Sequence, residues 1–198
     1  MRKSTTAALA ALAFALASPG SSPATSTAVP SSLPGELTGP APWGRNADRL
    51  RARLVALRLP ALGFEGTAVH IHQHLDIYVA GRHVVLPAGV GIDPAGRFIS
   101  PLHTHDTSGV IHVESPTVRP FTLGEFFGVW GVRLGTGELG GYKAGGGRAL
   151  HAYVDGKEVT GDPGKIVLAP HQEIVLAFGT PKQLRRALPT SYAFPAGL

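Results

Sequence analysis

A run of histidines alternating with other residues decides the fold of this chain. It reads His70-Ile71-His72-Gln73-His74-Leu75-Asp76-Ile77-Tyr78-Val79. Because side chains of a β-strand alternate between the two faces of a sheet, we expect His70, His72 and His74 to share one face. The aliphatic side chains of the run would occupy the other face. The stretch therefore predicts a strand with an apolar side and a side rich in imidazole.

More histidines follow about thirty residues later, in His103-Thr104-His105-Asp106 and in His112-Val113-Glu114. On a strand, residues i and i+2 lie roughly 6.5 to 7 Å apart, so two imidazoles can reach one metal ion, whereas a third at i+4 overshoots. We expect a site that combines two histidines of the first run with histidines of the later segments.

The predicted metal ligands are His70, His72, His74, His103, His105 and His112. Asp106 and Glu114 are expected beside them, where a carboxylate can orient an imidazole through its free N–H group. A hydrogen-bonded polar network that fixes strand register without metal remains the alternative. The isolated histidines, His83, His151 and His171, are expected to be ordinary, partly buried residues.

The amino-acid composition limits which metal ions and partners the chain could bind. The chain has no cysteine, and its only methionine is the initiator, so the soft ligands preferred by Cu(I) are absent. Imidazole and carboxylate ligands favour Cu(II) or Zn(II), with Fe(II), Ni(II) and Mn(II) also possible. The formal charge of +5 is not gathered in a basic patch interleaved with aromatic residues, which argues against nucleic acid as a partner.

The N-terminus resembles a secretory signal peptide, with Met1-Arg2-Lys3 before an apolar stretch that ends near Ala17. We expect a signal peptide over 1–24, a disordered Pro/Ser-rich tether over 25–42, a single His-rich domain over 43–180 and a C-terminal tail over 181–198. No later stretch approaches the roughly 20 apolar residues of a transmembrane segment. These features predict a secreted or cell-envelope protein without a cysteine for lipid attachment.

Two helices are predicted. Asn46 could cap a helix that ends near Leu59, with its arginines, Arg49, Arg51, Arg53 and Arg58, on a solvated side. Thr122 and Glu125 form a capping-box pattern for a second, apolar helix that ends near Gly131.

Strands and turns make up the rest. Ala80-Gly81 and Asp155-Gly156 predict two similar hairpins. Further strands are expected over 110–114, 165–168 and 173–178, and the glycine-rich stretch 135–148 is expected to be a mobile loop. This order indicates an α+β fold, a mainly antiparallel curved sheet with one packed helix, resembling a β-grasp. An all-β cupin-like barrel or sandwich is the alternative.

Three segments together resemble a functionally uncharacterised family of exported bacterial proteins. They are the histidine run from His70, the segment from Pro101 to Ser115 that contains Pro-Leu-His-Thr-His-Asp, and Phe121-Thr-Leu-Gly-Glu-Phe-Phe. The resemblance covers about residues 59–179 and implies export and a shared histidine-rich core, but no reaction.

The sequence therefore predicts an exported protein that binds a transition-metal ion for capture or delivery. A His-ligated metalloenzyme, an oxygenase or hydrolase in which Asp106 or Glu114 moves protons, is a second possibility. The chain lacks H-E-x-x-H, G-x-S-x-G and phosphate-loop motifs, and its catalytic residues stay unassigned. A third possibility is an interaction module with a structural metal or histidine network and a partner in the cell envelope.

Overall fold

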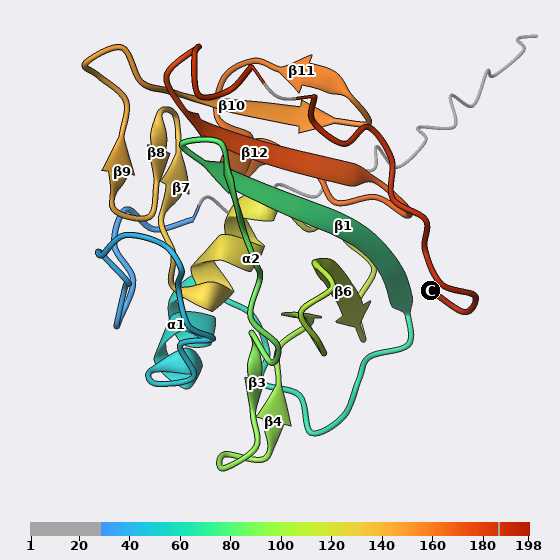
Figure 1. The fold of residues 1–198 in the computed structure, drawn as a ribbon. Helices are drawn as coiled ribbons and strands as arrows, with labels where there is room; N and C mark the ends of the chain where they lie inside the picture. Colours follow the sequence, from blue (N-terminus) through green and yellow to red (C-terminus); the bar gives the residue numbers. More distant parts are fainter. Residues whose placement is uncertain (1–28, 186) are drawn as a thin grey trace, which may run out of the picture.

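A computed structural model describes residues 29–185 and 187–198, so the expected signal peptide lies outside the described residues (Figure 1). The helices are α1 (Leu50–Leu57), α2 (Leu123–Trp130) and the 3-10 helix η1 (Pro163–Lys165). The longer strands are β1 (Val69–Val79), β6 (Val110–Ser115), β10 (Ala149–Val154) and β12 (Glu173–Gly179). The shorter strands are β2 (Arg82–Val84), β3 (Ile92–Asp93), β4 (Phe98–Ile99), β5 (Leu102–His103), β7 (Leu134–Gly135), β8 (Glu138–Leu139), β9 (Tyr142–Lys143) and β11 (Lys157–Val159).

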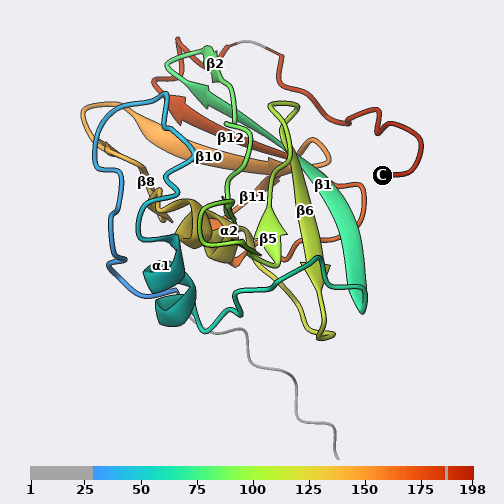
Figure 2. The same cartoon turned by 90° about the horizontal axis from the view of Figure 1, so that it is seen from below.

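The main sheet has the strand order β11-β10-β12-β1-β6-β5, and β2 pairs with one end of β1. The central strands β1 and β12 run parallel, and the other pairs in this sheet are antiparallel. Figure 2 shows β1, β6 and β5 side by side. The sheet is open and mixed, and with two α-helices it confirms the α+β class. Neither the β-grasp-like detail nor the barrel alternative is confirmed.

The core lies between the sheet and helix α2. Every residue of α2 is buried, and Phe126 and Trp130 belong to the same apolar cluster as Ile77, Ile111 and Val113 of strands β1 and β6. Since side chains alternate along a strand, the histidines of β1 and β6 point to the opposite face of the sheet. The predicted apolar and imidazole-rich faces are therefore both present.

The strongest local signals of the sequence are confirmed. The side chain of Thr122 accepts a hydrogen bond from the Glu125 backbone N–H, and the Glu125 carboxylate accepts one from the Thr122 backbone N–H, so the capping box is formed. The helix ends at Trp130, and Gly131 after it caps the helix in the left-handed conformation. The turns Ala80-Gly81 and Asp155-Gly156 have the positive φ angles of tight hairpins, 51° and 79° in the first and 49° and 75° in the second.

The first helix differs from its prediction. It begins at Leu50, and Asn46 does not cap it, because its side-chain amide donates instead to the carbonyls of Gly35 and Trp130. Arg53, expected on a solvated side, is fully buried. Its guanidinium donates to the carbonyls of Val129, Pro34, Asp48 and Asn46, and this set of acceptors explains why a charged group can be buried there.

Two predicted segments take another conformation. The stretch 135–148, expected as a mobile loop, contributes to the small antiparallel sheet β7-β8-β9, because Leu139 and Tyr142 pack against the core. The expected strand over 165–168 instead contains the end of η1 and a single bridge between Val167 and Thr122.

The segments at both ends of the domain pack on it. Within the expected tether, Leu33 is buried and Leu37 bridges to Val132, so ordered structure in the described chain begins before Trp43. Within the expected tail, the Tyr192 ring stacks on the His74 ring with centroids 3.8 Å apart. Apolar and aromatic side chains of both segments thus contact the domain.

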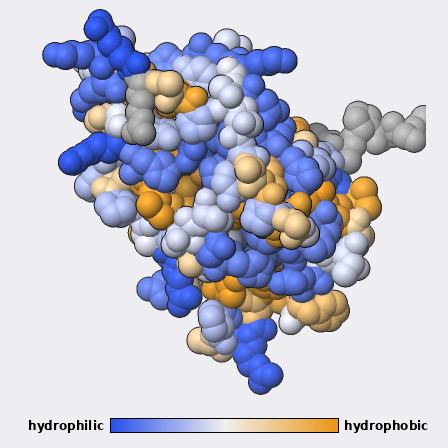
Figure 3. All heavy atoms as spheres, turned by 45° about the vertical axis from the view of Figure 1, so that its right-hand side comes forward, coloured by the Kyte–Doolittle hydropathy of each residue, from blue (hydrophilic) through white to orange (hydrophobic). Residues whose placement is uncertain are grey.

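The surface is mixed in polarity. Figure 3 shows apolar side chains scattered among hydrophilic ones on the face that it presents. Across residues 29–185 and 187–198, no helix has the length and apolar character needed to cross a membrane.

Replacing Arg53 with lysine is expected to destabilise the protein, because an ammonium group cannot serve the four carbonyls that the guanidinium reaches. We expect a loss of about 2 kcal/mol or more in the free energy of unfolding, measured with urea. Arg58→Lys, at an exposed position just after α1, is the matched control and should change it by less than about 0.5 kcal/mol. Equal stabilities of the two variants would contradict this role of Arg53.

Candidate metal centre

Three neighbouring strands bring histidines into one row. Strand register places His72 of β1 opposite His112 of β6, and His112 opposite His103 of β5. The ring centroids of His72 and His112 lie 4.5 Å apart, and those of His103 and His112 lie 5.3 Å apart. His105, in the loop after β5, has its ring 4.4 Å from that of His112. The expected convergence of separate segments is therefore present in the structure.

His103, His105, His112 and Glu114 form a group whose potential ligand atoms all lie within 4.8 Å of one another. The Nε2 atoms of His103 and His105 are 3.1 Å apart, and Glu114 Oε2 is 4.0 Å from His103 Nε2. Donors around a tetrahedral Zn²⁺ ion with Zn–N bonds of 2.0 to 2.1 Å are about 3.3 Å apart. The group could therefore hold a metal ion with small side-chain adjustments.

His103 has the hydrogen bond expected of a metal-binding imidazole. Its Nδ1 lies 3.0 Å from the backbone carbonyl oxygen of Ser100, which can only accept, so Nδ1 carries the proton. The lone pair is then on Nε2, the atom that faces His105. A carbonyl that fixes the tautomer in this way is a common partner of histidine ligands.

Glu114 also belongs to a second group, together with His70 and His72. His70 Nε2 lies 3.4 Å from Glu114 Oε1. His72 Nε2 and Glu114 Oε2 are buried and have no hydrogen-bond partner among the described residues. Sequence reasoning placed Glu114 beside the ligands, whereas the structure places it between the two groups.

Burial keeps the imidazoles of this row neutral. Loss of solvent, followed by the charges of neighbouring histidines, lowers the pKa of His103 to about 3 and that of His112 to about 4. The same causes lower the pKa of His72. Burial, with the nearby Glu65 carboxylate, raises the pKa of Glu114 to about 7. Neutral imidazoles offer the lone pairs that a metal ion needs.

His74 lies apart from the other five predicted ligands. Its Nδ1 is 2.8 Å from Glu173 Oε2, and its Nε2 is 2.8 Å from the Ser108 carbonyl oxygen. Burial lowers the pKa of His74, but the hydrogen bond and charge of Glu173 outweigh burial and raise it. His74, Asp76 and Glu173 form a third group that could hold an ion. Both ring nitrogens of His74 already have partners, which favours an imidazolium–carboxylate pair here.

Two carboxylates near the cluster differ from the sequence-based picture. Asp106 accepts a hydrogen bond from the Ser108 backbone N–H at 2.8 Å, is exposed, and joins none of the groups. Glu65, which sequence reasoning missed, lies 3.5 Å from His105 Nε2. Glu65 stands in a loop without a periodic pattern, so the sequence carried no signal for it.

The three histidines that were not predicted as ligands, His83, His151 and His171, contact residues outside the histidine cluster. His83 Nε2 lies 2.7 Å from Asp76 Oδ1, and His151 Nδ1 lies 2.7 Å from Glu158 Oε1. The ring of His171 is tilted against that of Phe194, with centroids 4.8 Å apart.

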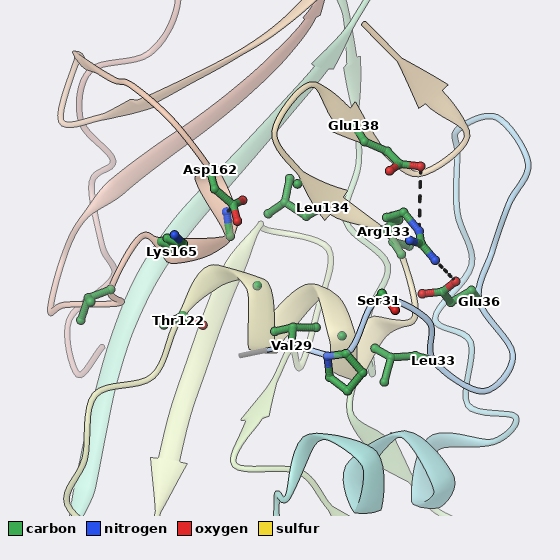
Figure 4. A pocket seen from close by; sticks show the side chains of 17 residues that line it. Val29, Ser31, Leu33, Glu36, Thr122, Arg133, Leu134, Glu138, Asp162 and Lys165 are labelled. Carbon is green, nitrogen blue, oxygen red and sulfur yellow. Dashed lines mark hydrogen bonds and ion pairs between the residues drawn. The ribbon is translucent and has the colours of Figure 1, made fainter. Parts of the chain in front are cut away.

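A cavity away from the histidines lies beside helix α2 (Figure 4). It has a volume of about 520 Å³ and shares no residue with the histidine groups. At one end Arg133 is paired with Glu36 and Glu138, and at the other the Asp162 side chain accepts from the Gly164 backbone N–H. Since Arg133, its two glutamate partners and Asp162 already pair with each other or with backbone, we place the functional site at the histidines.

Comparisons with protein-family models, with curated proteins and with solved structures found no match for this chain. The geometry of the histidine and glutamate groups therefore carries the functional assignment.

The metal-free protein is expected to lose stability as pH falls. Unfolded histidine binds a proton near pH 6.5, whereas folded His112 does so only near 4, so acid favours the unfolded state between these values. In urea unfolding from pH 7.5 to 4, His112→Asn should reduce the pH slope by up to about 1.4 kcal/mol per pH unit. Identical slopes in wild type and His112→Asn would contradict the buried, neutral state of this ring.

Proposed function

We propose that this chain is an exported protein that binds Cu(II) or Zn(II) through its histidine cluster, in metal capture or delivery. The observation that carries the proposal is the group of His103, His105, His112 and Glu114, whose ligand atoms lie within 4.8 Å of one another. Nitrogen and carboxylate donors suit both ions, and the choice between them depends on supply as well as affinity.

The unpaired polar atoms favour a metal ion over a purely hydrogen-bonded network. A network that fixed the strands by itself would satisfy its buried atoms, because each unpaired one costs about 1 to 3 kcal/mol. His72 Nε2 and Glu114 Oε2 have no such partner among the described residues. A cation at His103, His105, His112 and Glu114 would supply the missing interaction of Glu114 Oε2, and a cation at His70, His72 and Glu114 would supply that of His72 Nε2.

Access from solvent supports capture or delivery over a purely structural ion. The His105 side chain is 43% exposed and Glu65 beside it is 52% exposed, while His103 is fully buried. An ion held here would have rigid donors on the strands and a reachable donor in a loop. Such a site lets an ion enter and leave without opening the sheet.

Export is part of the same proposal. The basic start Met1-Arg2-Lys3 and the apolar stretch that follows support a secreted or cell-envelope location. The resemblance to an exported bacterial family supports it as well. We also propose that the main sheet and α2 are β-grasp-like, since two parallel central strands, β1 and β12, lie above a single buried helix.

Metal binding can be measured on untagged, metal-free protein by calorimetric titration with Zn²⁺ and Cu²⁺. Wild type should bind at least one ion. His103→Ala/His105→Ala removes half of the four-residue group and should weaken binding by roughly 100-fold or more. His83→Ala/His151→Ala removes two histidines outside that group and should leave the affinity unchanged.

Unchanged affinity in the His103→Ala/His105→Ala variant would contradict the proposed function. Exchange measurements then separate the alternatives. An ion that chelators remove without unfolding the protein supports capture or delivery, whereas one whose removal unfolds it indicates a structural role. A bound ion that turns over a substrate would instead favour the metalloenzyme.

A further inference from the structure

Glu114 lies between two sets of histidines and belongs to a candidate group with each. One set is His103, His105 and His112, and the other is His70 and His72. In each group the potential ligand atoms lie within 4.8 Å of one another, so either group could hold an ion. The two ions would then share one carboxylate.

The two oxygens of that carboxylate reach donors of both sets. Oε1 lies 3.1 Å from His112 Nδ1 and 3.4 Å from His70 Nε2, and Oε2 lies 4.0 Å from His103 Nε2. Oε2 is buried and has no hydrogen-bond partner among the described residues, as is true of His72 Nε2. A carboxylate that contacts histidines of both sets can bridge two ions, which in two-metal sites lie about 3.5 to 4 Å apart.

A groove lies beside His70 and His72. Both histidines line a groove of about 400 Å³ together with Pro170 and His171. The His70 side chain is 55% exposed, so this side of the cluster opens to solvent. Three protein donors and an accessible groove leave a coordination position for water, unlike the four-residue group on the other side.

We propose that the histidine cluster holds two divalent transition-metal ions bridged by Glu114, with the second ion between His70 and His72. The inference rests on the proposed function, because it needs the first ion at His103, His105 and His112. The second ion keeps an open position, so it exchanges faster and is the one that binds small anions such as azide. The pair of ions, and not a single one, is then the unit that the protein carries.

Stoichiometry tests the proposal on the full, untagged chain. Metal-free protein is dialysed against Zn²⁺ and its bound metal is measured by elemental analysis. Wild type should hold two ions, and His70→Ala/His72→Ala should hold one, because only donors of the second ion are removed. If the double variant folds poorly, His70→Ala alone, which changes an exposed side chain, should also hold one ion. The matched control His83→Ala/His151→Ala should hold two.

Copper tests the bridge. The first equivalent of Cu²⁺ should give an unbroadened electron paramagnetic resonance signal, and the second should broaden it, because two unpaired spins come close. Glu114→Gln removes a charged bridging ligand and should abolish the broadening and lower the stoichiometry to one.

Each outcome has a distinct meaning. One ion in wild type overturns the two-ion inference and leaves the proposed function standing, whereas no bound ion overturns both. Two ions retained in His70→Ala/His72→Ala overturn the placement and point to the group of His74, Asp76 and Glu173.

Discussion

The register of strand β6 between β1 and β5 is the constraint on which the site depends. It sets His112 between His72 and His103 in one row across the sheet. A shift of one residue would turn His112 into the core and bring Ile111 or Val113 to the other face. Both aliphatic residues are fully buried in the cluster that includes helix α2. Core packing therefore holds the imidazoles in position, and the site need not stabilise its own geometry.

Burying this row of histidines and Glu114 costs free energy, and the protonation states and hydrogen bonds of the row show where the cost falls. Solvent exclusion keeps His103 and His112 uncharged, and the proton of His103 Nδ1 is held by the Ser100 carbonyl. The remaining buried atoms, His72 Nε2 and Glu114 Oε2, have no partner among the described residues. An unpaired acceptor beside neutral imidazoles is unfavourable in a metal-free protein but well suited to a cation. The local instability of the row is thus explained by the ligand that we propose.

How much the sequence could predict depends on how local each signal is. The capping box of Thr122 and the two hairpin turns are encoded within a few residues, and all three are confirmed. Arg53 was misassigned because its acceptors include the carbonyl of Val129, 76 residues away, which no local pattern reveals. His74 continues the alternation of its strand, yet its partner Glu173 comes from a parallel neighbour that only the sheet order brings close. Alternation predicts a shared face, whereas membership of one cluster depends on neighbouring strands.

The donors of the cluster divide into rigid and movable ones, and this division bears on what the site can do. His72, His103 and His112 are buried on strands whose backbone is paired on both sides or held against the core. His105 belongs to a loop and is 43% exposed. Donors fixed by the sheet bind without losing further conformational entropy, which favours affinity. A loop donor can leave the ion at little cost, which favours release. A site with both kinds of donor can bind an ion with high affinity and still release it.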